Sequence, residues 1–445
     1  MKVKQIIAVM LSFTLLACGE PQTVKNTTQQ QAQSESMPSA EVASELNTLA
    51  ERYVKLTLLV GEHQDYYIDA YYGPAEWRDE ATKLPLADLE LQAATLLSDI
   101  KLAKASTDEQ LRKDMLVVQT RSVEAFIKQL NGTVLSFDDE SMALYDAKSP
   151  NLTEADFAKA INELDNLLVG EGNINERLDA FQAQFIIPLE KLDTVFTAAI
   201  EESRKRTKAY IELPENESFT IEYVKDKPWS GYNWYQGNSF SLIQVNTDLP
   251  IQIERAIDLA SHEGYPGHHV FNSLMEKHLV NANGWVEYSV YPLYSPLSLL
   301  AEGSANYGIN VAYNHVDRMA FEKDVLFPLA GLDATKAEAY YQVKEILGKL
   351  SYAGNVAAQR YLDGELNKQQ TTEFLIKYAL QTSGKASQRV GFIERYRAYV
   401  INYNLGKDIV KDYVQFNAGD NEEKRWQVFA DLLSNPKSAS MMVVR

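Results

Sequence analysis

The chain has 445 residues, of which 45% are hydrophobic and 23% are charged, and its formal net charge at pH 7 is −18. This composition is typical of a globular protein with a large hydrophobic core. Nucleic acids and anionic membrane surfaces bind basic patches, so the acidic balance argues against both as partners. The composition does not indicate an oligomeric state.

The N-terminus predicts a secreted lipoprotein. Residues 1–17 contain two lysines and then an apolar run at 6–16, which is the pattern of a secretory signal peptide. The run is shorter than the roughly 20 residues that a membrane-spanning helix needs. The segment LLAC, which ends at Cys18, resembles the lipobox of bacterial lipoproteins, where cleavage precedes a cysteine that is then acylated. Because Cys18 is the only cysteine, we expect no disulfide within the mature chain.

The residues after Cys18 predict a tether and one folded unit. Gly19 rather than Asp follows the cysteine, which in Gram-negative lipoproteins goes with sorting to the outer membrane, facing the periplasm. The lipid is then the only expected contact with the membrane. Residues 18–42 are rich in Gln, Ser and Thr, so they predict a flexible tether. We expect residues 43–445 to form a single catalytic unit, with a helical lobe at 43–215 and a metal-binding lobe at 216–445.

The folded unit is predicted to be mainly α-helical. Apolar residues recur at helical spacing in 45–60, 88–100 and 109–130, and the last of these stretches ends at Asn131-Gly132, a helix C-cap signal. Further helical patterns follow up to about residue 211, and Pro188 is expected to kink the last of them.

A small antiparallel β-sheet is expected directly before the histidine-rich segment. Residues 218–246 alternate β-branched and aromatic residues with polar residues and turn formers, which predicts two or three antiparallel strands. Residues 286–294 are a further candidate strand. Helices resume at about Leu297 and continue to the C-terminus, so the fold class is a large helical body that carries a small sheet.

The segment SHEGYPGHHV at 261–270 contains three of the six histidines. The amphipathic stretch before it predicts a helix that places His262 and Glu263 about 100° apart around its axis. His262 can then face a metal while Glu263 reaches a water molecule bound to it. Pro266 lacks an amide hydrogen and its ring collides with the carbonyl of His262, so the helix cannot continue regularly.

The second histidine ligand depends on how the chain passes Pro266. In a regular helix His269 returns to the face of His262, because seven residues turn about 700°. If two residues bulge out instead, His268 takes the place of the second histidine of an HExxH motif. The proline and Gly267 favour the bulge, so we predict His268 as the ligand. His269 is then expected to line the site or to pack behind it.

Glu302 is the predicted third ligand, because a catalytic zinc site needs three protein ligands and one open position. It lies in an apolar helix that Ser295 can cap and that has Pro296 at its first position. The small residues at 303–305 would let two helices approach closely. A carboxylate enclosed in such a segment needs a partner, since burying an isolated charge is costly, and a metal is one such partner.

These segments resemble a known bacterial family. HEGYPGHH, together with YIDAYYGPAEW (67–77), DKPWSGYNWYQG (226–237), NTDLP (246–250) and AEGSANY (301–307), is similar to the family named domain of unknown function 885. The resemblance covers nearly the whole chain after the tether. Members look like relatives of helical zinc peptidases such as carboxypeptidase Taq. The resemblance implies that His262, His268 and Glu302 bind zinc and that Glu263 is the base.

Other residues are candidates for substrate binding and catalysis. Arg395, Tyr399 and Tyr403 are spaced four apart in a predicted helix, where an arginine could hold a peptide carboxylate and a tyrosine could donate to the developing oxyanion. Trp234 and Tyr235 could wall a substrate cleft or fill a core.

The leading hypothesis is a lipid-anchored zinc peptidase of the cell envelope, with one Zn²⁺ per chain and small peptides as substrates. One alternative is a non-catalytic envelope lipoprotein that binds peptide or metal. Another is a metal hydrolase of non-peptide amides or esters. Glu263 argues against a mere binder, because a metal holder needs no base beside its ligand.

Overall fold

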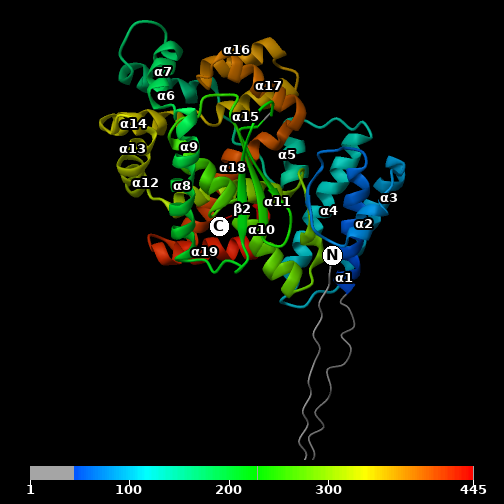
Figure 1. Ribbon diagram of the computed structural model, residues 1–445. Coiled ribbons are helices and arrows are strands. Elements are labelled where there is room, and N and C mark those ends of the chain that lie inside the picture. The colour runs from blue at the N-terminus through cyan, green and yellow to red at the C-terminus, as the bar shows by residue number, and fades with distance from the viewer. Residues whose placement is uncertain (1–44, 228, 444–445) are drawn as a thin grey trace, which may run out of the picture. The chain divides into compact units, whose positions relative to one another are not determined.

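Helices form most of the structure and surround a small central sheet, as a computed structural model shows (Figure 1). The structure describes residues 45–227 and 229–443, which belong to one compact unit, Ala43–Arg445. The predicted signal peptide at 1–17, Cys18 and the whole tether at 18–42 lie outside the described residues. The prediction of a mainly helical fold with a small sheet is confirmed.

The helices that precede the central sheet are α1 (Glu45–Gly61), α2 (Ala75–Asp79), α3 (Leu86–Leu102), α4 (Gln110–Leu130), α5 (Phe137–Tyr145), α6 (Glu154–Leu167), α7 (Ile174–Gln182) and α8 (Leu192–Lys208). Those that follow it are α9 (Glu254–Leu259), α10 (His268–Met275), α11 (Pro296–Ala312), α12 (His315–Phe321), α13 (Phe327–Ala330), α14 (Ala337–Gly348), α15 (Ala353–Leu362), α16 (Lys368–Tyr378), α17 (Ser383–Tyr396), α18 (Ile401–Ala418) and α19 (Glu422–Ser434).

The helices expected near the N-terminus are confirmed as α1, α3 and α4. Gly132 has a φ of 96° and ends α4 as the sequence predicts, with the amide of Thr133 donating to the carbonyl of Lys128 at 2.9 Å. At Pro188 the helix breaks rather than kinks. The residues between α7 and α8 pair instead with the segment before α9, where the Ile187 amide donates to the Ile251 carbonyl at 2.9 Å.

The central sheet is mixed, so the prediction of a purely antiparallel sheet is wrong. Its strands are β2 (Ser218–Val224), β3 (Gly231–Tyr235) and β4 (Phe240–Asn246), in the order β2-β4-β3. β4 pairs antiparallel with β3 and parallel with β2. β3, the next strand along the chain, therefore does not pair with β2, because β4 lies between them. The alternation of residue types marks the strands but not their order.

A second, two-stranded sheet joins distant parts of the chain. β1 (Ile68–Tyr71) pairs antiparallel with β5 (Val290–Pro292), which confirms the later part of the candidate strand at 286–294. The earlier part, Val286–Ser289, is a 3-10 helix. This pairing brings the YIDAYYG segment to the region of the histidine-rich helix.

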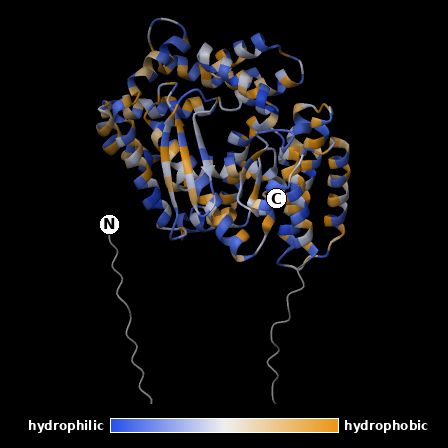
Figure 2. Cartoon of the chain, turned by 45° about the vertical axis from the view of Figure 1, so that its right-hand side comes forward, coloured by the Kyte–Doolittle hydropathy of each residue, from blue (hydrophilic) through white to orange (hydrophobic). Residues whose placement is uncertain are grey.

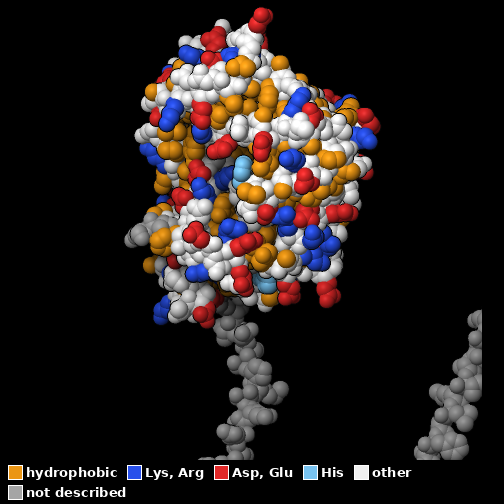
Figure 3. Space-filling view, turned by 90° about the vertical axis from the view of Figure 1, so that its left-hand side faces the viewer, with side chains coloured by type: hydrophobic (Ala, Val, Ile, Leu, Met, Phe, Trp, Pro, Cys, Tyr) orange, Lys and Arg blue, Asp and Glu red, His pale blue; other side chains and the backbone are white. Residues whose placement is uncertain are grey.

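Each of the three hydrophobic clusters of the core combines residues from both sides of position 215. The predicted division into two lobes is therefore not visible in the packing. Most helices carry hydrophobic and hydrophilic residues on different faces (Figure 2). Over one face of the surface, acidic, basic and hydrophobic side chains are interspersed (Figure 3). Among the described residues, no helix has the length and apolar character to span a bilayer.

α11 lies at the centre of this packing, and almost all of its residues are buried. Ser295 caps it by accepting a hydrogen bond from the Ser298 amide, as predicted. The expected close approach at Gly303 occurs against α18, where a Cβ on Gly303 would lie 2.4 Å from the carbonyl oxygen of Gly406. The small residue that faces the histidine-rich segment is Gly308, whose Cβ would lie 3.1 Å from Pro266 Cγ.

We expect Gly303→Ala to lower the free energy of unfolding by about 2 kcal/mol or more, because the new methyl group meets a backbone carbonyl that cannot move alone. Gly391→Ala in α17 is the matched control, since its Cβ would meet no atom within 4 Å. The control should be neutral or stabilise by up to about 1 kcal/mol, as alanine favours the helix. Urea unfolding of both variants measures the difference, and equal stabilities would contradict the packing described here.

Candidate functional site

The helix that carries His262 and Glu263 ends in a wider turn. α9 continues directly into a π-helix, η3 (Ala260–Gly264), so the expected helix reaches Gly264 but not with regular α geometry. The amide of Tyr265 donates to the carbonyl of Ala260, and that of Gly267 donates to the carbonyl of Ser261, each at 2.9 Å. The chain bulges at Tyr265–Gly267 and a new helix, α10, begins at His268.

Gly267 allows the chain to fold back onto the preceding turn. A Cβ at this position would lie 1.9 Å from the His262 carbonyl oxygen and 2.4 Å from that of Ser261, which no side chain can tolerate. The close approach returns His268 to His262, whereas His269 points away. The sequence PGHH therefore encodes a bulge that selects the first of its two histidines.

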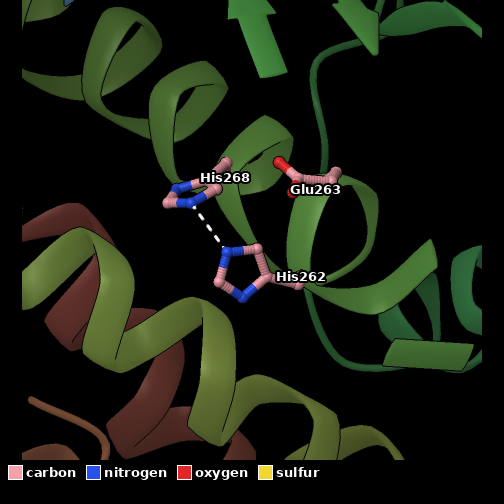
Figure 4. Close-up of side chains that lie close together, drawn as sticks. All are labelled: His262, Glu263 and His268. Carbon is pink, nitrogen blue, oxygen red and sulfur yellow. Dashed lines mark hydrogen bonds between the residues drawn. The ribbon is translucent and has the colours of Figure 1, made fainter. Parts of the chain in front are cut away.

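Three side chains converge at this point. Nε2 of His262 lies 3.1 Å from Nε2 of His268 (Figure 4). Oε2 of Glu302, from α11, lies 3.3 Å from Nε2 of His262 and 3.8 Å from Nε2 of His268. Glu263 approaches the two imidazoles from the same turn as His262, within the 4.8 Å that groups it with them.

The residues present fit a metal ion. Oε2 of Glu302 is buried and, although it is close to His262, receives no properly directed hydrogen bond. Two imidazole nitrogens and this oxygen offer lone pairs to one point, and such a set is costly to bury without a proton or a cation among them. Two histidines and one carboxylate are a usual donor set for zinc.

Burial and neighbouring charges shift the pKa values of this group. Burial, with the charge of His262, lowers the pKa of His268 to about 4. Burial also acts to raise the pKa of Glu302, but the nearby His262 imidazole, the charges of both histidines and the hydrogen bond from Tyr399 outweigh it and hold the pKa below its ordinary value. Burial raises the pKa of Glu263 to about 7. The pKa values of the two carboxyl groups are therefore shifted in opposite directions within one site, that of Glu302 down and that of Glu263 up.

Strand β3 packs against Glu263. The backbone carbonyl of Glu263 accepts a hydrogen bond from Nδ2 of Asn233 at 2.7 Å. A Cβ on Gly231 would lie 2.6 Å from Cδ2 of Leu259 and 2.8 Å from Oε1 of Glu263, so a side chain at this position would displace the carboxylate. The central sheet thus serves as one wall of the site.

Arg395, Tyr399 and Tyr403 do not share one helical face, contrary to the prediction. α17 ends at Tyr396, and Arg397 adopts a positive φ of 52° before a 3-10 turn leads into α18. Buried Glu140 holds this break, because it accepts a hydrogen bond from Arg397 Nε at 2.7 Å and another from the Ala398 amide at 3.1 Å.

Each of the three residues has a different environment. The Tyr399 hydroxyl donates to Oε1 of Glu302 at 2.8 Å, so it orients the carboxylate. Tyr403 lines the cavity, and its hydroxyl has no hydrogen-bond partner in the part of the chain that the structure describes. Arg395 is exposed, and its guanidinium lies 4.7 Å from the centre of the Tyr66 ring.

The predicted lining residues divide between wall and core. Trp234 is 46% exposed and borders the cavity, with its indole nitrogen donating to Gln244. Tyr235 also lines the cavity although it is largely buried, and it donates its hydroxyl hydrogen to Glu276. His269 packs behind the site, where Nδ1 lies 2.8 Å from Ser241 Oγ.

A cavity of about 1100 Å³ opens beside the convergent side chains, and His262, Glu263, His268 and Glu302 all line it. Three further polar residues of its wall were missed by the sequence analysis: Asp69, Arg389 and Lys407. Asp69 accepts the hydroxyl hydrogen of Tyr232, and burial raises its pKa to about 7. Asp69 falls in the YIDAYYG segment, but nothing in that segment alone marks it as part of a site.

Glu217 anchors both ends of the bulge. Its buried Oε2 accepts a hydrogen bond from the Tyr265 hydroxyl at 2.5 Å and lies 3.2 Å from Nε2 of His269. Its Oε1 accepts a hydrogen bond from Arg204 Nε at 3.0 Å. Since Tyr265 and His269 flank the residues that carry His268 into the site, one carboxylate fixes the position of the whole bulge.

We expect Glu217→Gln to lower the free energy of unfolding by about 2 kcal/mol, because it weakens charge-assisted hydrogen bonds to a buried group. Glu212→Gln is the control, since the Glu212 side chain is 94% exposed and its ion pair with Lys277 is superficial. The control should change stability by less than about 0.5 kcal/mol. Chemical denaturation compares the two variants, and a similar loss in both would show that Glu217 is not an anchor.

No family model matches the sequence, and no curated protein matches it. Solved structures give distant likenesses. A candidate lipoprotein from Colwellia psychrerythraea is 16% identical with a TM-score of 0.48, over 80% of this chain and 68% of that one. A candidate lipoprotein of unknown function from Shewanella oneidensis is 13% identical with a TM-score of 0.41, over 91% and 79%. The M32 carboxypeptidase of Deinococcus radiodurans R1 is 12% identical with a TM-score of 0.35, over 88% and 90%. Likenesses this distant carry no functional argument, so any argument for function rests on the site itself.

Proposed function

We propose that this protein is a zinc-dependent hydrolase that cleaves peptide bonds in the bacterial cell envelope. The observation that carries the proposal is the convergence of the His262 and His268 imidazoles with a buried Glu302 oxygen that lacks a directed hydrogen bond. This donor set lies in the wall of a cavity large enough for a small peptide. One zinc ion per chain, held by these three residues, would supply a water molecule of lowered pKa and would polarise a substrate carbonyl.

Glu263 is the proposed general base. It is adjacent to His262 in the chain, and one of its carboxylate oxygens lies within 4.8 Å of ring nitrogens of His262 and His268. We assign it as the base rather than a ligand because Oε2 of Glu302 already lies 3.3 Å and 3.8 Å from the Nε2 atoms of the two histidines. Gly231 leaves the space that this carboxylate occupies. A carboxylate in this position can accept a proton from water at one oxygen and return it to the leaving amine.

Two tyrosines have separate proposed roles. Tyr399 is a positioning residue, because its hydrogen bond to Oε1 of Glu302 leaves Oε2 turned toward the histidines. Tyr403 is the proposed donor to the developing oxyanion, since its hydroxyl faces the cavity and has no partner among the described residues. Arg395 is exposed at the cavity wall, where it can contact only the outer part of a substrate.

The proposed location rests on the N-terminal sequence. The lipobox that ends at Cys18 and the glycine after it favour a lipid anchor in the outer membrane, with the folded unit in the periplasm. In that compartment peptides are the expected substrates and the membrane is contacted only through the lipid.

The bulge predicts which histidine controls metal content. His262→Ala, His268→Ala and Glu302→Ala should each lose most of the bound zinc, whereas His269→Ala should retain far more, because its ring contacts Ser241 and Glu217 instead. Elemental analysis of purified, folded protein measures zinc per chain, with about one expected in the wild type. Greater zinc loss in His269→Ala than in folded His268→Ala would show that the ligand assignment is wrong.

Glu263→Gln separates an enzyme from a binding protein. The substitution keeps the size of the side chain but removes the basic carboxylate, so zinc content and melting temperature should stay close to those of the wild type. Loss of general base catalysis typically costs about 10²- to 10⁴-fold in rate. We therefore expect kcat/KM on small peptides, followed by mass spectrometry, to fall at least about 100-fold.

The wild type with zinc removed by a chelator is the control for metal dependence. If wild type and Glu263→Gln cleave peptides equally, Glu263 is not the base. If neither cleaves any peptide in a broad mixture, the hydrolase proposal fails and a binding function takes its place.

A further inference from the structure

Among the described residues, two half-buried cationic side chains in the wall of the cavity lack a carboxylate partner. Arg389, on α17, and Lys407, on α18, line the same cavity as the metal-binding candidates. Neither forms an ion pair or a hydrogen bond within the part of the chain that the structure describes. This is unusual for half-buried cations in a chain whose formal net charge is −18.

Arg389 is held by apolar surroundings rather than by an acid. Its guanidinium lies 5.0 Å from the centre of the Phe392 ring and packs against Gly354, whose Cβ would lie 3.6 Å from one of its nitrogens. Burial lowers the pKa of Arg389 below its ordinary value, and no carboxylate opposes that effect. The side chain is therefore desolvated, yet its hydrogen-bond donors are not used by the protein.

Two acids act on Lys407, and both have other partners: Asp258 is paired with cations, and Asp408 accepts a hydrogen bond from the Tyr352 hydroxyl at 2.7 Å. Oδ1 of Asp258 lies 2.8 Å from Arg318, and Oδ2 lies 3.4 Å from Arg255. Lys407 forms no ion pair with either acid. Burial lowers its pKa, although the charge of Asp258 acts in the opposite direction.

Both cations border the cavity on the side of Tyr403. Lys407 follows Tyr403 by one turn of α18, so the two side chains share a helical face. The Tyr403 hydroxyl is within electrostatic reach of Arg389 and of the carboxylates of Glu302 and Glu263. The rings of Phe392 and Tyr403 are 6.2 Å apart, which connects the α17 and α18 parts of the wall.

We propose that Arg389 and Lys407 bind a carboxylate group of the substrate inside this cavity. The inference rests on the proposed peptidase function and names the kind of peptide that the site selects. A carboxylate supplies the acceptors that both cations lack, and an arginine can hold it through two parallel hydrogen bonds. In a peptide this group is either the C-terminal carboxylate or an acidic side chain.

Matched peptides distinguish the two sources. The first pair is Ala-Phe-Ala with a free C-terminus and its C-terminal amide. The second pair is acetyl-Ala-Glu-Ala-amide and acetyl-Ala-Gln-Ala-amide. Calorimetry measures Kd in the zinc-loaded Glu263→Gln protein, where substrates are expected to persist, and kcat/KM is measured in the wild type. In at least one pair the charged peptide should bind about 10- to 100-fold more tightly than its neutral match.

Arg389→Gln and Lys407→Met should each reduce that preference, and the double variant should abolish it. Lys411→Met is the control, since Lys411 lies one turn further along α18 and is not among the residues of the cavity wall. Melting temperatures check that every variant is folded. If Arg389→Gln does not fold, Lys407→Met alone must reduce the preference.

The possible failures are distinguishable. Equal binding and turnover of charged and neutral peptides, or a preference that survives in the double variant, would overturn the carboxylate site and leave the peptidase function intact. A preference in binding that depends on these two cations, with no turnover of any peptide by the wild type, would support the carboxylate site and refute the peptidase function.

Discussion

The close contact between the backbone at Gly267 and the preceding helical turn is the constraint on which the site depends. With no side chain at this position, the chain can rest against the carbonyls of Ser261 and His262 and begin a new helix at once. The π-turn before it supplies the extra length. As a result, the Nε2 atoms of two histidines that are six residues apart in the chain lie 3.1 Å from each other. In a regular helix with an HExxH motif, the two histidines that share one face are four residues apart.

The layers around this bulge have distinct functions. Behind it, Glu217 contacts Tyr265, His269 and Arg204, so one carboxylate links the two ends of the bulge. In front of it, β3 leaves space for Glu263 through a glycine, and α11 presents Glu302 with its second oxygen fixed by Tyr399. Such supporting contacts orient donor atoms before a metal or substrate binds, which lowers the ordering cost at that moment.

The sequence was sufficient for features that depend on local chemistry. Proline and glycine after His262 predicted the bulge, and the Ser295 cap fixed the helix of Glu302. Features set by distant partners were not predictable. The break at Arg397 depends on Glu140, which lies 257 residues away in the chain, and the mixed sheet depends on a strand order that alternation does not record. Arg389 and Lys407 are notable only for missing partners, which a single sequence cannot reveal.

The acidity of the chain limits how a carboxylate could be recognised. A formal net charge of −18 disfavours the approach of anionic peptides at long range, but salt screens that effect beyond about 8 Å at physiological ionic strength. Recognition must therefore come from contacts inside the cavity, where Arg389 and Lys407 are desolvated and unpaired. Burying these two cations without a partner costs free energy in the folded protein, and a bound carboxylate would offset part of that cost. An acidic surface with a locally cationic wall thus favours selectivity by slow dissociation rather than by rapid electrostatic capture.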